Sequence, residues 1–125
     1  RHGLPREERL YLLGKKLEGL ITKFKPDLIA VEKLYFNVNQ KTALAVAEAR
    51  GVVLYLAAKN HTPLLEFSPQ EIKIAVTSYG KASKREVASM LERLLYLPQK
   101  KRLDDEYDAI AIALTACAQK VLSTE

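Results

Sequence analysis

The stretch DLIAVEKLY, from Asp27 to Tyr35, decides the fold of this chain. Its apolar residues run unbroken from Leu28 to Val31, and a run of this kind predicts a short strand that is buried on both faces. The run ends in Glu32, whose carboxylate is costly to bury unless water, a cation or a metal ion compensates its charge. Glu32 is therefore either a surface residue just beyond the strand or part of a functional site.

Helices are expected before and after this strand in the sequence. Apolar residues recur at helical spacing in the first segment, Asn39 is an N-cap candidate for the second, and Ser68 and Ser83 each begin a capping box. The predicted helices cover residues 6–25, 39–60, 68–78, 83–97 and 104–122, and the predicted strands cover 27–35 and 62–67. The order α, β, α, β, α, α, α indicates an α/β fold.

The length and composition restrict the class of protein. The 125 residues predict a single domain with a core of its own. The one cysteine, Cys117, excludes an internal disulfide, lies in the apolar stretch AIAIALTACAQ, and is predicted to be a small core residue of a protein from a reducing compartment. No apolar run approaches the ~20 residues of a membrane span, and residues 1–10 do not resemble a signal peptide.

Two strands make a very small sheet for a strand with two buried faces. Such a strand normally pairs along both edges. The pattern therefore predicts either that strands precede Arg1 in a longer protein or that another chain completes the sheet.

The excess positive charge lies in one segment. Between Lys81 and Arg102 there are seven basic and two acidic residues, a balance of +5 that equals the formal charge of the whole chain. A clustered basic segment is typical of proteins that bind polyanions, although a solvated helix face has the same composition.

Four acidic residues crowd the start of the last predicted helix, at positions 104, 105, 106 and 108. Capping and the helix macrodipole explain one or two of them, but four like charges repel one another. Asp105 and Asp108 share a helix face, which Ala109 and Ile112 are predicted to continue as a buried stripe. With Glu32, three carboxylates could converge, and such oxygen ligands suit Mg²⁺ or Mn²⁺ and two-metal phosphodiester hydrolysis.

From about Leu4 to Gln119 the chain resembles the RuvC family of Holliday-junction resolvases, which have a ribonuclease H-like fold. The landmarks occur in the family's order and spacing: IAVEKLYF, ALAVAEARGVVL, SPQEIKIAVTSYGKASKREV and DDEYDAIAIALT. The resemblance implies a mixed sheet flanked by helices and a Mg²⁺-dependent crossover junction endodeoxyribonuclease of bacterial cytoplasm, acting in DNA recombination and repair. Such an enzyme resolves four-way DNA junctions by paired symmetric nicks.

The resemblance also implies roles for individual residues. Glu32, Asp105 and Asp108 match three of the four carboxylates that hold two Mg²⁺ ions, for which Mn²⁺ can substitute. Lys73 and Lys84 match basic residues that contact DNA phosphates or support the site, and Lys84 is expected to take part in catalysis as well as in DNA binding.

Further DNA contacts and partners are expected on the same basis. Tyr35 stands where the family has an aromatic residue that stacks on bases near the centre of the junction, and a strand-end aromatic is the alternative explanation. Lys81 and Arg85 of the basic segment are expected to contact DNA as well. The helix around Ala43–Leu56 matches the region through which the family forms homodimers, and a branch-migration motor is an expected partner.

One family feature does not occur in this sequence. The fourth carboxylate belongs to a turn like GIDPG on the first strand, and no such stretch is found here. We therefore expect an N-terminally incomplete ribonuclease H-like domain that lacks the first strands and cleaves poorly by itself. Two alternatives stay open, a related nuclease acting on RNA and a non-catalytic junction-binding module.

Overall fold

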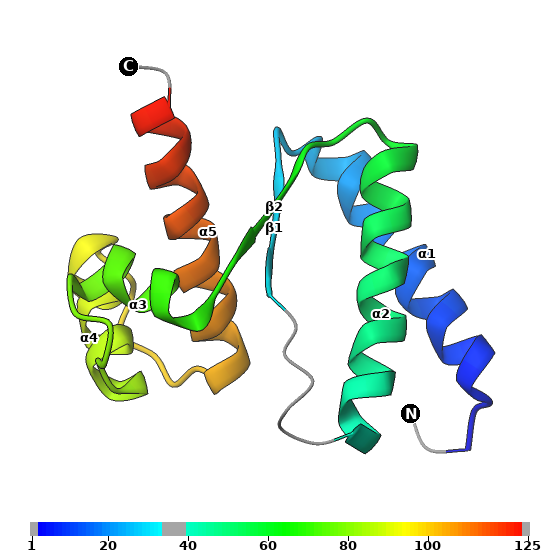
Figure 1. Ribbon diagram of the computed structural model, residues 1–125, viewed down its shortest axis with the longest axis horizontal. Coiled ribbons are helices and arrows are strands. Elements are labelled where there is room, and N and C mark those ends of the chain that lie inside the picture. The colour runs from blue at the N-terminus through cyan, green and yellow to red at the C-terminus, as the bar shows by residue number, and fades with distance from the viewer. Residues whose placement is uncertain (1–2, 34–39, 124–125) are drawn as a thin grey trace. The chain divides into compact units, whose positions relative to one another are not determined.

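The computed structural model describes residues 3–33 and 40–123 and confirms the predicted order of elements. The elements shown in Figure 1 are α1 (Arg6–Phe24), β1 (Ile29–Glu32), α2 (Gln40–Lys59), β2 (Leu64–Phe67), α3 (Pro69–Thr77), α4 (Lys84–Leu94) and α5 (Asp104–Ser123). The predictions for Tyr35 and for the N-cap Asn39 fall outside the described residues.

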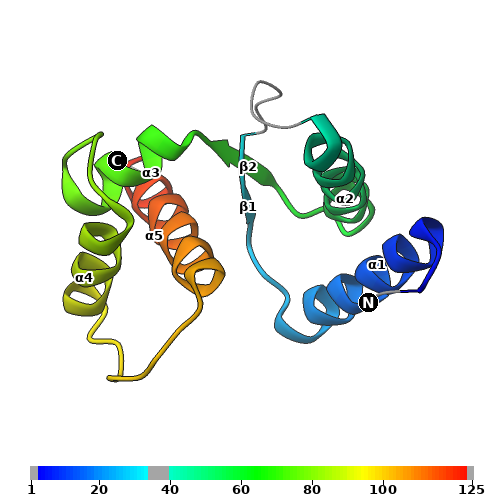
Figure 2. The same ribbon diagram turned by 90° about the horizontal axis from the view of Figure 1, so that it is seen from below.

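The two strands pair in parallel. The Ile29 amide donates to the Pro63 carbonyl at 2.8 Å, and the Lys33 amide donates to the Phe67 carbonyl at 2.8 Å, so both partners advance together along the chain. Parallel neighbours need a crossover connection, and α2 supplies it. Figure 2 shows the same pair of strands from below.

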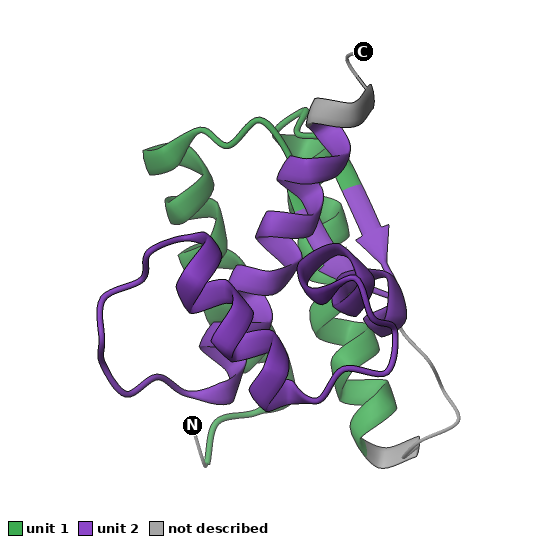
Figure 3. Cartoon of the chain, turned by 90° about the vertical axis from the view of Figure 1, so that its left-hand side faces the viewer, with its two compact units in different colours: residues 1–29, 34–64 green, residues 30–33, 65–125 purple. Residues whose placement is uncertain are grey.

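The described chain divides into two compact units, coloured in Figure 3. Unit 1 comprises residues 1–29 and 34–64, in which α1 packs on α2. Unit 2 comprises residues 30–33 and 65–125, in which α3, α4 and α5 pack on one another. The expectation of one domain stays a prediction.

Local sequence explains where α3 and α4 begin. The Ser68 hydroxyl accepts the Glu71 amide at 3.1 Å, and the Glu71 carboxylate accepts the Ser68 amide at 2.8 Å. Ser83 and Glu86 repeat both bonds at the same distances. These are the two capping boxes that the sequence predicts, and they fix the first residue of each helix.

The strand β1 is less buried than the sequence predicts. Leu28, Ile29, Ala30 and Val31 are half-buried. Within the described residues β1 pairs with β2 and with no second strand, which leaves its other edge and part of its faces uncovered.

The buried face of α5 also differs from the prediction. Ala111 and Thr115 are buried, whereas Ala109 and Cys117 are exposed. Ala109 lies two positions from the buried Ala111, about 200° around the helix, whereas Cys117 follows the buried Ala116 and is about 100° from it. The predictions that Ala109 continues a buried stripe and that Cys117 is a core residue are therefore wrong, because α3 and α4 pack on α5 and both positions lie outside its buried face.

The helices of the described residues are all too short or too polar to cross a lipid bilayer.

Candidate nucleic-acid site

A cavity of about 570 Å³ lies within unit 2, between the end of β1 and the helices α3, α4 and α5. Its wall includes two predicted carboxylates and three predicted basic residues. The complete lining is Glu32, Pro69, Ile72, Lys73, Lys84, Arg85, Val87, Ala88, Asp104, Tyr107, Asp108 and Ala111.

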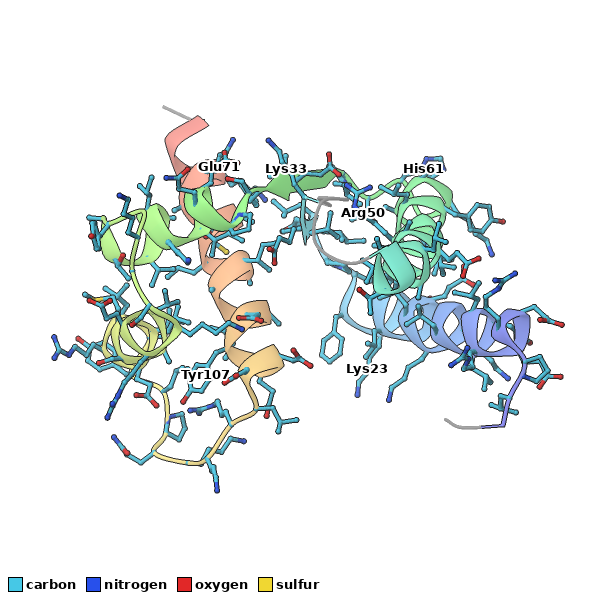
Figure 4. The ribbon with its side chains drawn as sticks, turned by 60° about the horizontal axis from the view of Figure 1, so that its bottom comes forward. Lys23, Lys33, Arg50, His61, Glu71 and Tyr107 are labelled. Carbon is cyan, nitrogen blue, oxygen red and sulfur yellow. The ribbon has the colours of Figure 1, made fainter. Side chains whose placement is uncertain are left out.

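Glu32 reaches this cavity because it is the last residue of β1. The next residue, Lys33, is held on β2 through its amide, and its ammonium lies 3.7 Å from the Glu71 carboxylate of α3. Figure 4 labels both Lys33 and Glu71. The amide bond holds the end of β1 on β2, and the exposed ion pair adds a weak contact to the start of α3. Glu32 is an exposed residue on the wall of the cavity, and its functional role stays a prediction.

The electrostatics of Glu32 show which charges face it. Partial burial of its carboxylate is the largest cause that raises the pKa of Glu32 above 4.5, and the negative charge of Asp108 raises it further. The positive charges of Lys84 and Lys73 act in the opposite direction. Two carboxylates and two ammonium groups therefore interact across one cavity.

Lys84 and Asp108 form the ion pair of this site, with 3.6 Å between nitrogen and oxygen. The side chains are 71% and 54% exposed, so water screens their attraction and the pair contributes little stability. Separating the Lys84 ammonium from the Asp108 carboxylate therefore costs little free energy. The ammonium can turn to a phosphate and the carboxylate to a cation without a large loss.

Helix starts position the basic residues. Ser83 caps α4, which makes Lys84 its first residue, with Arg85 next. Lys73 lies one turn into α3, behind the cap at Ser68. The lining cations thus come from two helices whose beginnings are fixed by their own sequences.

Some predicted site residues lie elsewhere. Asp105 and Lys81 are exposed and do not line the cavity. Residues 3–33 and 40–123 contain no group of three or more His, Cys, Asp or Glu side chains close enough to hold a metal ion together. The structure therefore brings Glu32 and Asp108 together and leaves Asp105 apart from them.

Among the polar lining residues, Asp104 and Tyr107 were not predicted as site residues. Asp104, Asp108, Ala111 and Thr115 follow the spacing i, i+4, i+7, i+11, which is one face of a helix. That spacing, anchored on the buried Ala111 and Thr115, could have selected Asp104 in place of Asp105 for this wall.

The basic segment between Lys81 and Arg102 is not exposed along its whole length. The Arg102 side chain is only 6% exposed, and its Nη1 lies 4.0 Å from the Glu92 carboxylate. Arg102 therefore belongs to the packing of α4 and α5, while Lys84 and Arg85 face the cavity.

Comparison with known proteins identifies relatives that match most of this chain. The sequence profile described as "Crossover junction endodeoxyribonuclease RuvC" matches residues 2–116. Proteins of that name from Pseudothermotoga lettingae and Desulforamulus reducens are 49% and 44% identical over 110 and 111 residues. These matches cover 88% and 89% of this chain and 68% of each relative.

Solved structures agree with the sequence comparison. A Thermus thermophilus RuvC structure is 31% identical, with a TM-score of 0.89, over 99% of this chain and 75% of that one. The same protein in complex with a Holliday junction substrate gives a TM-score of 0.91 at the same identity and coverage. The likeness confirms the predicted α/β fold of the ribonuclease H-like type.

Proposed function

Because the chain belongs to the RuvC family of crossover junction endodeoxyribonucleases, we propose that it binds four-way DNA junctions and contributes to their cleavage by paired symmetric nicks. The observation that carries this proposal is the cavity of unit 2. There, Glu32 and Asp108 face Lys73, Lys84 and Arg85. Carboxylates suit the divalent ions of phosphodiester hydrolysis, and the basic residues suit the phosphate that is cleaved.

The carboxylates fit a divalent cation. Asp108 raises the pKa of Glu32 through like-charge repulsion, and a cation between the two groups would remove that cost. We assign Glu32 and Asp108 as ligands of Mg²⁺, for which Mn²⁺ can substitute. Asp105, which the resemblance implies as a further ligand, is exposed outside the cavity lining and would have to turn toward the cavity to join them. When bound, two such ions activate the attacking water and stabilise the leaving 3′-oxygen.

The basic residues act on the DNA. Lys73 and Lys84 neutralise charge that develops on the scissile phosphate, and Arg85 holds the same strand next to it. Lys81, which is exposed before α4, contacts a neighbouring phosphate. Tyr35 stacks on bases near the junction centre, as the resemblance implies.

Two opposed nicks require two sites, so the proposal includes a homodimer. The region Ala43–Leu56 of α2 carries the exposed apolar side chains Leu44, Val46 and Tyr55, which a second copy would cover. The same proposal places the protein in DNA recombination and repair in bacterial cytoplasm, beside a branch-migration motor.

A binding titration tests the proposal. Binding is the first readout, because it can be measured without turnover. Affinity for a four-way junction and for linear duplex is compared in Ca²⁺, which should support binding without turnover, at one salt concentration. A strong preference for the junction is expected.

The outcomes separate the alternatives. Preference for RNA or equal binding of junction and duplex by a folded chain would refute junction recognition; circular dichroism checks folding. Glu32→Gln and Asp105→Asn should abolish cleavage and leave junction binding largely intact. If both variants lose binding, these carboxylates are structural and the catalytic assignment fails. Junction binding without cleavage in Mg²⁺ or Mn²⁺ would favour the non-catalytic module.

A further inference from the structure

Tyr107 connects the acidic start of α5 to α4. Its hydroxyl donates a hydrogen bond of 2.8 Å to Oε2 of Glu92, a residue of α4 that lies 15 positions earlier. Its side chain also lines the cavity that contains Glu32 and Asp108. Figure 4 labels Tyr107 on the first turns of α5.

Arg102 supports the same contact from the segment before α5. Its Nη2 donates to the Pro98 carbonyl at 3.0 Å, and its Nη1 lies 4.0 Å from the same Glu92 oxygen. The guanidinium carbon lies 5.8 Å from the centre of the Tyr107 ring, within the range of a cation–π contact. The Glu92 carboxylate is therefore approached by both the Tyr107 hydroxyl and the Arg102 guanidinium.

The hydrogen bonds within the first turn of α5 do not connect this turn to α4. The Glu106 carboxylate accepts the Leu103 amide at 2.9 Å, which determines where the helix begins. That bond stays within one turn and does not hold the turn against α4. The bond from Tyr107 to Glu92 does, because its partners belong to different helices.

The bond between Tyr107 and Glu92 lies in the helix turn that carries Asp104 and Asp108, so it can affect the directions of their carboxylates. Successive helix residues are about 100° apart, so any rotation of the first turn of α5 swings the neighbouring Asp108 and, one turn earlier, Asp104. Both line the cavity that Glu32 also lines, and the charge of Asp108 acts on Glu32. The terminal turns of helices also unfold locally at a low free-energy cost. The first turn of α5 therefore needs a contact with another element to keep its position.

We propose that Tyr107 is a positioning residue, whose hydroxyl bond to Glu92, supported by Arg102, keeps Asp104 and Asp108 on the wall of the cavity that Glu32 also lines. This inference rests on the proposed function, since it assumes that Glu32 and Asp108 hold a divalent ion. Tyr107 itself need not touch the ion or the DNA.

The test compares Tyr107→Phe, which removes only the hydroxyl, with Tyr96→Phe, which removes the hydroxyl of a side chain that is 91% exposed. Mn²⁺ binding is measured by calorimetry without DNA, and junction affinity is measured without divalent ions. Groups hydrogen-bonded directly to metal ligands are worth about 10–100-fold in metal affinity. Tyr107 bonds to Glu92 and acts on Asp108 only through the helix, so we expect the lower end of that range, about tenfold weaker Mn²⁺ binding in Tyr107→Phe. Tyr96→Phe should bind Mn²⁺ like the unaltered chain, and junction affinity should change less than about twofold in both variants.

A double-mutant cycle tests whether the effect passes through Glu92. In a Glu92→Gln background, Tyr107→Phe should weaken Mn²⁺ binding by much less than it does alone. The stability control is Leu91→Ala, which removes a fully buried side chain from α4. It should lower the thermal midpoint without weakening Mn²⁺ binding at temperatures where it is folded.

Contrary results distinguish this inference from the proposed function. Unchanged Mn²⁺ binding in Tyr107→Phe, or weakening that Leu91→Ala reproduces, would overturn the positioning role if Glu32→Gln still abolishes Mn²⁺ binding. Mn²⁺ binding that is insensitive to Glu32→Gln would overturn the metal assignment and the positioning role together.

Discussion

Replacing Arg85 with glutamine should flatten the salt dependence of junction binding. Arg85 is exposed at the cavity, and among the described residues no carboxylate lies within ion-pair distance of its guanidinium. Its neighbour Lys84, in contrast, lies 3.6 Å from Asp108. No ion pair among the described residues therefore has to be broken before a phosphate binds Arg85, and this residue should contribute close to one full phosphate contact.

The size of the effect follows from counterion release. Each neutralised phosphate adds ~0.9 to the slope of log affinity against log salt. Between about 50 and 200 mM salt, a fourfold change, the unaltered chain should lose ~3.5-fold more affinity than Arg85→Gln. Fluorescence anisotropy of a labelled junction in Ca²⁺, over a potassium chloride series, measures both slopes.

Two control variants make this result specific. Arg85→Lys keeps the charge and should retain the slope. Lys16→Gln removes one exposed positive charge from α1, in the other unit, and should leave the slope nearly unchanged. An unchanged slope in Arg85→Gln would refute the phosphate contact. An equal change in Lys16→Gln would show that net charge, and not the cavity, determines the affinity.

Four further predictions concern the site and its support. Asp108→Asn should lower the pKa of Glu32 toward 4.5, since it removes a like charge; carbon NMR of the carboxyl checks this, and an unchanged pKa would disprove the coupling. The raised pKa means that Glu32 holds its proton more tightly in the folded state than in the unfolded state. Ionisation of Glu32 therefore lowers the free energy of unfolding as pH rises from 4.5 through the raised pKa. Denaturant unfolding should thus show Glu32→Gln gaining stability relative to the unaltered chain between about pH 4 and pH 7, and no relative gain would contradict the sign. Leu91→Ala should lower the free energy of unfolding by about 2–5 kcal/mol, because this side chain is fully buried, and a loss below about 1 kcal/mol would refute its core role. Ser83→Ala should cost about 1 kcal/mol by removing the cap of α4, whereas the same change at the exposed Ser89 should cost less.

The local sequence was sufficient to place the elements and several site residues. Ser68 and Ser83 define the starts of α3 and α4 through bonds to residues three positions away, so neighbouring residues suffice to predict them. Glu32 was identified because an apolar run ends there, and a strand end has a fixed position in a parallel sheet. Such features depend on short-range contacts, which sequence spacing describes well.

The tertiary structure alone decided which side of α5 faces inward. Ile110, Ala111 and Ile112 follow one another, so the helix is apolar nearly all round and its periodicity selects no face. Packing against α3 and α4 buries the side of Ala111, which brings Asp104 and Asp108 to the cavity and leaves Asp105 outside its lining.

The same holds for the contacts that connect distant positions. No spacing rule predicts that Tyr107 bonds to Glu92 or that Arg102, in a strongly basic segment, is buried beside it. These contacts depend on how two helices dock, and docking is determined by side-chain shape over the whole interface. The sequence by itself therefore determined the elements and the chemical character of the site, while the packing of α5 determined which acidic residues face Glu32.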